Sequence, residues 1–92
     1  MSEKARISMI IKGQVQGVFF RYETKKEAER LGLTGLVKNN NDGNVEILAE
    51  GDKNKLEELA KWCKSGPDSA QVENVEIKWQ EYNGRFEGFE IS

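Results

Sequence analysis

Hydrophobic and polar residues alternate along the segment 6–15, as expected for a β-strand. The large apolar side chains of one face are Ile7, Met9 and Ile11. Ile10 lies on the opposite face, so both faces carry apolar surface, and we expect this strand at the centre of a sheet. Gly13 and Gly17 then interrupt the pattern and predict a loop.

The spacing becomes helical in two later segments. In the first, 21–31, the inward stripe is expected to be Phe20, Thr24, Ala28 and Leu31. Gly32 follows as the expected left-handed stop. In the second, Asp52 is a candidate N-cap and Gly66-Pro67 marks the end. The stripe of this second helix is expected to be Leu56, Leu59, Ala60 and Cys63.

Alternation also predicts four further strands, which are 33–39, 45–50, 75–80 and 89–91. The turn sequence NNNDG joins the first two of these as a hairpin. The order is therefore βαββαβ plus a short C-terminal strand. It predicts an α+β, ferredoxin-like split βαβ fold, with an antiparallel sheet, both helices on one face and the other face largely open to water. A chain of 92 residues is expected to be a single domain spanning 1–92.

Composition excludes several functional classes. The net charge of −2, with both signs interspersed, argues against a nucleic-acid-binding surface, and no apolar run approaches a membrane span. The chain has no histidine and one cysteine, Cys63, so neither a zinc site nor a histidine base is expected. Cys63 is interpreted as an inert core thiol. The N-terminus has no signal-peptide pattern, so we expect a cytoplasmic protein.

The loop 13–20 precedes a predicted helix start, and Arg21 lies in the first turn of that helix. Helix N-termini have unpaired N–H groups and a partial positive charge, and a glycine-relieved loop lets such groups converge on an anion. An arginine adds a charged fork that suits phosphate oxygens. The alternative is a tight β-to-α turn with a surface arginine, and composition alone does not decide between the two.

Two motifs decide this question by resemblance. The first comprises Gly13, Val15, Gln16, Gly17, Val18, Phe20 and Arg21. The second comprises Gly35-Leu36-Val37-Lys38-Asn39 followed by Gly43, Val45 and Gly51. Together with Gly88-Phe89-Glu90-Ile91, they make the whole chain resemble the acylphosphatase family. The resemblance implies hydrolysis of acyl phosphates to a carboxylate and inorganic phosphate.

The resemblance also implies a set of site residues. Arg21 is expected to bind the phosphate, and Asn39 is expected to orient the attacking water. The phosphate cradle is expected to consist of the backbone amides of Gln16, Gly17, Val18, Phe19 and Phe20. No metal and no organic cofactor are expected. The expected partner is a small-molecule acyl phosphate substrate, and the protein is expected to be a monomer.

Some positions have other interpretations. Asn39 begins a run of three asparagines and could be an ordinary turn residue. Phe19 and Phe20 are expected in the core or the pocket wall. Gln14 replaces a basic residue that is common in the family, so one positive charge near the loop is missing, and Lys12 and Lys38 could compensate for it. Leu36 replaces a usual aromatic residue, and we expect this to change the packing under the site.

Two other functions compete with catalysis. The first is a non-catalytic module that binds phosphate or carbamoyl phosphate, as in acylphosphatase-like domains fused inside larger maturation proteins. The start and end of the chain coincide with the domain, and this favours a free-standing enzyme. The second is RNA binding on the same topology. The strands 6–15 and 45–50 offer no aromatic side chain on which bases could stack, and this argues against RNA binding.

Overall fold

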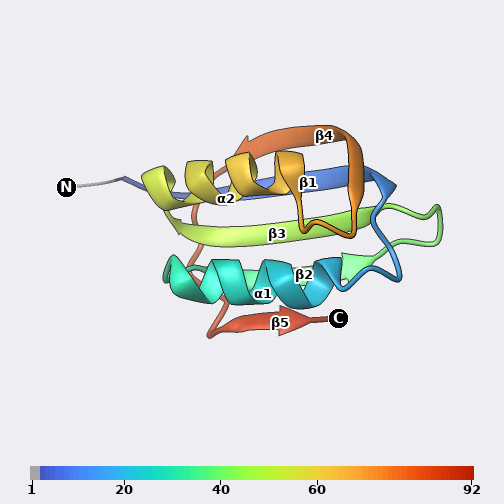
Figure 1. Ribbon diagram of the computed structural model, residues 1–92. Coiled ribbons are helices and arrows are strands. Elements are labelled where there is room, and N and C mark those ends of the chain that lie inside the picture. Colours follow the sequence, from blue (N-terminus) through green and yellow to red (C-terminus); the bar gives the residue numbers. More distant parts are fainter. Residues whose placement is uncertain (1–2) are drawn as a thin grey trace.

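A computed structural model describes residues 3–92 and contains a five-stranded sheet with two helices (Figure 1). In chain order the elements are β1 (Lys4–Gln14), α1 (Phe20–Arg30), β2 (Thr34–Asn39), β3 (Val45–Asp52), α2 (Lys53–Ser65), β4 (Gln71–Gln80) and β5 (Phe89–Ile91). The predicted βαββαβ order with a short C-terminal strand is confirmed.

The strands lie side by side in the order β4-β1-β3-β2-β5, so β1 is an interior strand as expected. The pairs that β1 forms with β3 and β4, and that β2 forms with β3, are antiparallel. The prediction of an antiparallel sheet is wrong at one edge, because β5 runs parallel to β2, with Gly35 opposite Phe89. β4 and β5 occupy opposite edges, so the chain between them crosses the sheet before β5 begins.

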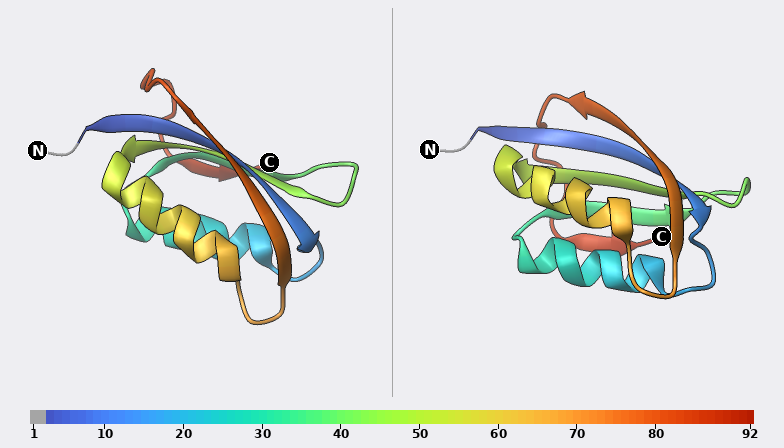
Figure 2. Two further views of the ribbon diagram at one scale, coloured as in Figure 1. Left: turned by 90° about the horizontal axis from the view of Figure 1, so that it is seen from above. Right: turned by 45° about the horizontal axis from the view of Figure 1, so that its top comes forward.

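Both helices cover the same face of the sheet (Figure 2). The core lies between them and the sheet, and it contains the predicted side chains of β1 and β3: Ile7, Met9, Ile11, Val45, Ile47 and Ala49. The helix stripes are confirmed as well, since Phe20, Thr24 and Ala28 of α1 and Leu56, Leu59 and Cys63 of α2 are buried. Phe20 also packs against Trp62 of α2, with ring centroids 5.6 Å apart.

The opposite face is less open than expected, because the connection 81–88 passes over it on the side away from the helices (Figure 1). Glu50, a residue of this face, is only 1% exposed. Its carboxylate accepts hydrogen bonds from the backbone N–H groups of Asn83 and Gly84, at 2.9 and 3.2 Å. The Arg6 Nε atom lies 3.7 Å from the same carboxylate. These contacts anchor the connection that leads to β5.

Helix α2 begins without the predicted side-chain cap. Asp52 occupies the N-cap position, but its side chain makes no capping hydrogen bond. The Lys53 N–H group instead donates to the Glu3 carbonyl, 2.7 Å away, so the start of the chain holds the start of this helix. Within residues 3–92, neither helix is long and apolar enough to cross a membrane.

Candidate active site

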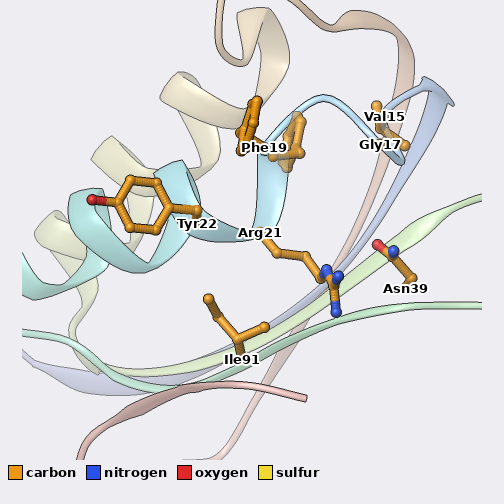
Figure 3. Close-up of a pocket in the computed structure, with 8 residues that line it drawn as sticks. Val15, Gly17, Phe19, Arg21, Tyr22, Asn39 and Ile91 are labelled. Carbon is orange, nitrogen blue, oxygen red and sulfur yellow. The ribbon is translucent and has the colours of Figure 1, made fainter.

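A cavity of about 300 Å³ opens where the loop after β1 meets the start of α1 and the ends of β2 and β5 (Figure 3). Its lining residues are Val15, Gly17, Phe19, Phe20, Arg21, Tyr22, Asn39 and Ile91. Residues of both sequence motifs therefore meet at one place, although most of α1 lies between the two motifs in the chain.

Arg21 and Asn39 face each other across this cavity. Figure 3 shows the Arg21 guanidinium directed toward the Asn39 carboxamide. Arg21 lies in the first turn of α1, and Asn39 is the last residue of β2, opposite Val45 of β3. The Arg21 Nη1 atom donates a hydrogen bond to the main-chain oxygen of Ser92, 3.0 Å away. A guanidinium has five N–H donors, so this bond orients the side chain and leaves other donors for an anion.

The Asn39 Oδ1 atom is buried and has no hydrogen-bond partner among the described residues. Buried polar atoms in folded proteins nearly always have a partner, and an exception calls for an explanation. The turn interpretation of Asn39 does not account for a carboxamide oxygen buried beside an arginine.

The loop between β1 and α1 has backbone N–H groups that are available to bind an acceptor. In the part of the chain that the structure describes, no N–H group of residues 16–20 donates a hydrogen bond to the protein. Two residues of the loop have left-handed backbone conformations, Gly17 with φ 73° and Phe19 with φ 62°. Phe19 is also the N-cap of α1 and provides no side-chain cap. The helix start is thus left open to an external acceptor.

The two phenylalanines of the loop differ in their surroundings. Phe20 is buried in the core, as expected, and contributes to the cavity wall. Phe19 lines the cavity, as expected for a wall residue, but it is 77% exposed and is not part of the core. Tyr22 is also exposed, with the Lys26 ammonium 5.6 Å from its ring centroid.

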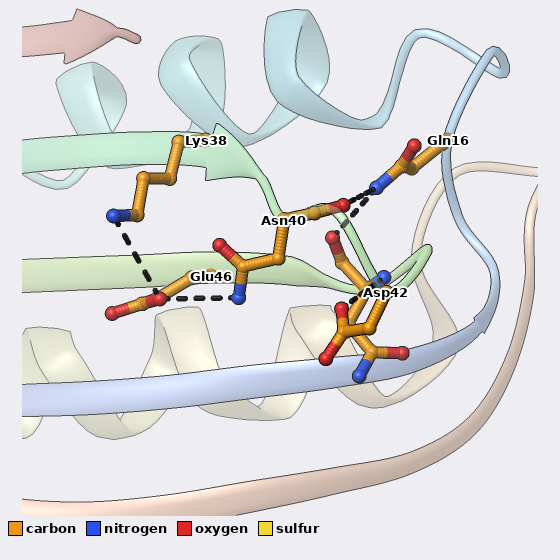
Figure 4. A network of polar contacts seen from close by, with 6 residues as sticks. Gln16, Lys38, Asn40, Asp42 and Glu46 are labelled. Carbon is orange, nitrogen blue, oxygen red and sulfur yellow. Dashed lines mark hydrogen bonds and ion pairs between the residues drawn. The ribbon is translucent and has the colours of Figure 1, made fainter.

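The side chain of Gln16 has a role that the sequence did not reveal. Its Nε2 atom donates hydrogen bonds to the carbonyls of Asn40 and Asn44, at 2.8 and 2.9 Å, in the turn between β2 and β3 (Figure 4). On the other side of the loop, the Ser69 hydroxyl donates to the Val18 carbonyl at 2.9 Å. No local pattern signals such contacts, because each joins residues far apart in the chain.

Neither lysine proposed to compensate for Gln14 lines the cavity. The Lys12 ammonium lies 2.8 Å from the Glu76 carboxylate, and this hydrogen bond, together with the negative charge, raises the pKa of Lys12. The Lys38 ammonium lies 4.0 Å from Glu46 on the same face of the sheet (Figure 4). Leu36 is likewise on that face, near Phe86, and not under the cavity.

Metal-ligating residue types and the one cysteine are distributed as follows in the described residues. Between residues 3 and 92 no group of three or more histidine, cysteine or acidic side chains is arranged to hold a metal ion. Cys63 is buried in the core, and this burial raises the pKa of its thiol. The interpretation of Cys63 as an inert core thiol is therefore supported.

Comparisons with known proteins agree with this geometry. Residues 7–91 match the family model described as acylphosphatase. A relative named acylphosphatase from Pelotomaculum thermopropionicum is 47% identical over 89 residues, which are 97% of each chain. The crystal structure of acylphosphatase from Bacillus subtilis superposes with a TM-score of 0.92 at 36% identity, covering 96% of this chain and 98% of that one.

A larger protein shares the fold. The crystal structure of full-length HypF in the phosphate- and nucleotide-bound form matches all of this chain with a TM-score of 0.85. The match covers 12% of that chain at 22% identity, and at this identity it shows the fold alone.

Proposed function

The chain belongs to the acylphosphatase family and is a hydrolase of acyl phosphates, and from that premise we propose how its residues divide the reaction. Arg21 and the backbone amides of residues 16–20 hold the phosphoryl group. Asn39 orients the water molecule that attacks the phosphorus atom. The substrate is a small-molecule acyl phosphate.

A single observation supports this division of roles most strongly. The Arg21 guanidinium and the Asn39 carboxamide share one cavity with a loop whose N–H groups have no acceptor in the described protein. A phosphoryl group has three non-bridging oxygens, which a guanidinium and several N–H groups can bind together. Asn39, on the far wall, then lies on the side from which water can approach.

The reaction needs positioning more than acid–base groups. The water oxygen forms a bond to phosphorus while the bond from phosphorus to the acyl oxygen breaks, and the electron pair leaves on the carboxylate. A carboxylate with a reference pKa of roughly 4 needs no proton from the enzyme. The chain has no histidine to accept the proton of the water, so we assign that proton to a phosphoryl oxygen of the substrate.

Arg21 and the loop amides stabilise the negative charge on the phosphoryl oxygens throughout this step. Because the transition state of phosphoryl transfer spreads charge over these oxygens, fixed donors around them supply most of the catalysis. The contact between Arg21 and the Ser92 main-chain oxygen supports this role, since it holds the guanidinium in place before substrate arrives.

The test of this proposal is phosphate release from benzoyl phosphate and acetyl phosphate, measured in parallel with equilibrium binding of inorganic phosphate. We expect turnover that inorganic phosphate inhibits competitively. The alternative, a non-catalytic module that binds phosphate or carbamoyl phosphate, predicts phosphate binding without turnover. Retention of single-stranded RNA on a filter at low salt would instead support the RNA-binding alternative.

We also propose that residues 1–92 act as one domain, as a monomer in the cytoplasm. The core cluster draws on strands and helices from Ile7 to Phe89, which supports a single folding unit. A buried, unpaired thiol at Cys63 is compatible with a reducing compartment. Sedimentation equilibrium of the purified chain measures the oligomeric state directly, and a dimer mass would contradict this part of the proposal.

A further inference from the structure

We infer that the Gln16 side chain is a positioning residue that sets the distance between the phosphate-binding loop and Asn39. This inference rests on the proposed function, because it assigns the two sides of the cavity to phosphate binding and to water orientation. The Gln16 backbone amide belongs to the proposed cradle, whereas its side chain points away to a different part of the fold (Figure 4).

The Gln16 side chain connects the loop after β1 to the turn between β2 and β3. Its Nε2 atom uses both hydrogens, one toward the Asn40 carbonyl and one toward the Asn44 carbonyl, at 2.8 and 2.9 Å. Among the hydrogen bonds of residues 3–92, these two are the only ones between the loop 15–19 and the turn 40–44. Gln16 is also half-buried, so water competes weakly for its amide.

The acceptors lie at the base of the turn, next to Asn39. The Asn40 N–H group donates to the Asn44 carbonyl at 2.8 Å, which closes the turn. The Asn40 side chain donates to Glu46 Oε1 at 3.1 Å, and Lys38 lies 4.0 Å from the same oxygen. Gln16 therefore binds the hydrogen-bonded base of the turn, and one of its two acceptors is the carbonyl of Asn40, the residue next to Asn39.

Asn39 depends on this support because its own side chain provides little. Its Oδ1 atom has no partner within the described protein, so no hydrogen bond to that oxygen fixes the carboxamide. Its position relative to the cradle then follows from the backbone of β2 and from the contact with Gln16. Misplacement of a reacting group by about 1 Å can lower a rate roughly 100-fold.

This arrangement predicts a separation of kinetic effects. The groups that bind phosphate, Arg21 and the amides, lie on the loop side of the Gln16 contact, and Asn39 lies on the other side. Loss of the contact should lower kcat, because water is aimed poorly. It should leave the affinity for inorganic phosphate nearly unchanged, because the cradle keeps its donors.

The experiment compares Gln16→Met, which is similar in length but lacks the donors, with Gln14→Met as the matched control. Gln14 is an exposed residue at the end of β1 and does not line the cavity. For Gln16→Met we expect kcat on benzoyl phosphate to fall about 10- to 100-fold, with the inhibition constant of inorganic phosphate within about two-fold of wild type. Gln14→Met should change neither value.

A double substitution tests whether Gln16 acts through Asn39. In an Asn39→Ala background, Gln16→Met should lower kcat by less than about three-fold further, because the group that it positions is already absent. Unchanged kcat in Gln16→Met overturns the inference. So does a full additional loss in the double variant, or a phosphate affinity that falls as much as kcat.

If Gln16→Met does not fold, the shorter Gln16→Asn is measured in the same way, with a smaller loss of kcat expected and no loss overturning the inference. The outcome is separable from that of the proposed function. If the wild-type chain releases no phosphate, or if Asn39→Ala keeps full turnover, the proposed function fails. If Asn39→Ala is impaired while Gln16→Met and Gln16→Asn are not, only the inference about Gln16 fails.

Discussion

Arg21, at the start of α1, donates a hydrogen bond from Nη1 to the main-chain oxygen of Ser92, 3.0 Å away, just beyond the end of β5. The strand at the edge of the sheet thus holds the side chain proposed to bind phosphate. Because β5 runs parallel to β2, its end lies beside the end of β2, where Asn39 is located. The parallel edge that the sequence did not predict therefore brings the end of the chain to the cavity.

Arg21→Gln should weaken phosphate binding as well as turnover. The guanidinium is expected to contact the phosphoryl oxygens in both the bound substrate and the transition state, so its removal affects both. We expect a loss of about 3 kcal/mol in transition-state stabilisation, which is roughly two orders of magnitude in kcat/KM, and a higher inhibition constant for phosphate. Arg30→Gln, at the other end of α1, is the control, because Arg30 pairs with Glu27. Competitive inhibition by phosphate that is unchanged in Arg21→Gln would refute the assignment.

Asn39→Ala should lower kcat by about 100- to 1,000-fold and leave phosphate inhibition almost unchanged, since the carboxamide is expected to act on water and not on phosphate. Asn41→Ala is the matched control, because Asn41 is exposed in the same turn. Steady-state kinetics on benzoyl phosphate distinguish the two. Equal turnover in both variants would mean that Asn39 has no role in catalysis and is an ordinary turn residue.

Glu50→Gln should lower the free energy of unfolding by about 2 kcal/mol. The carboxylate accepts from two backbone N–H groups, and a carboxamide in its place would turn an NH₂ group toward one of them. Urea unfolding measures the change. Glu76→Gln is the control. It removes an exposed ion pair with Lys12, so the free energy of unfolding should fall much less than in Glu50→Gln. Equal effects in the two variants would mean that Glu50 does not anchor the crossing connection.

Phe19→Gly should be more stable than Phe19→Ala by about 1 kcal/mol. Phe19 has φ 62° and ψ 19°, a left-handed conformation that strains any residue with a Cβ but not glycine. The ring is 77% exposed, so little packing is lost in either variant. Thermal unfolding followed by circular dichroism gives the difference. An alanine variant as stable as the glycine variant would show that the backbone at residue 19 is free of strain.

Cys63 should react with a thiol reagent at least about 100-fold more slowly in the native protein than in urea, because it becomes accessible only on opening of the core. Burial raises the pKa of this thiol, so at neutral pH it is protonated and a poor nucleophile. At any pH at which the protein remains folded, a smaller fraction of this thiol should be ionised than of an exposed cysteine. Rapid native labelling at pH 7 would contradict the burial of Cys63.

Most elements of the fold follow from local sequence. A strand with Ile7, Met9 and Ile11 on one face and a helix with a Phe20-to-Ala28 stripe each bury one side, and periodicity alone reveals which side that is. The candidate site was predictable only through the resemblance to a family, because Arg21 and Asn39 belong to the two motifs that carry this resemblance. Their meeting in one cavity agrees with that prediction.

Only the tertiary structure decided the features that depend on contacts between distant segments. The parallel pairing of β5, the burial of Glu50 under the 81–88 connection and the Gln16 contacts with Asn40 and Asn44 are of this kind. Periodicity records how a side chain lies relative to its neighbours along the chain, but not which strand, loop or carbonyl meets it across space. The local pattern therefore predicts the elements and their inward faces, and the family motifs point to Arg21 and Asn39 as candidates, while the packing of distant segments places those two side chains at one cavity.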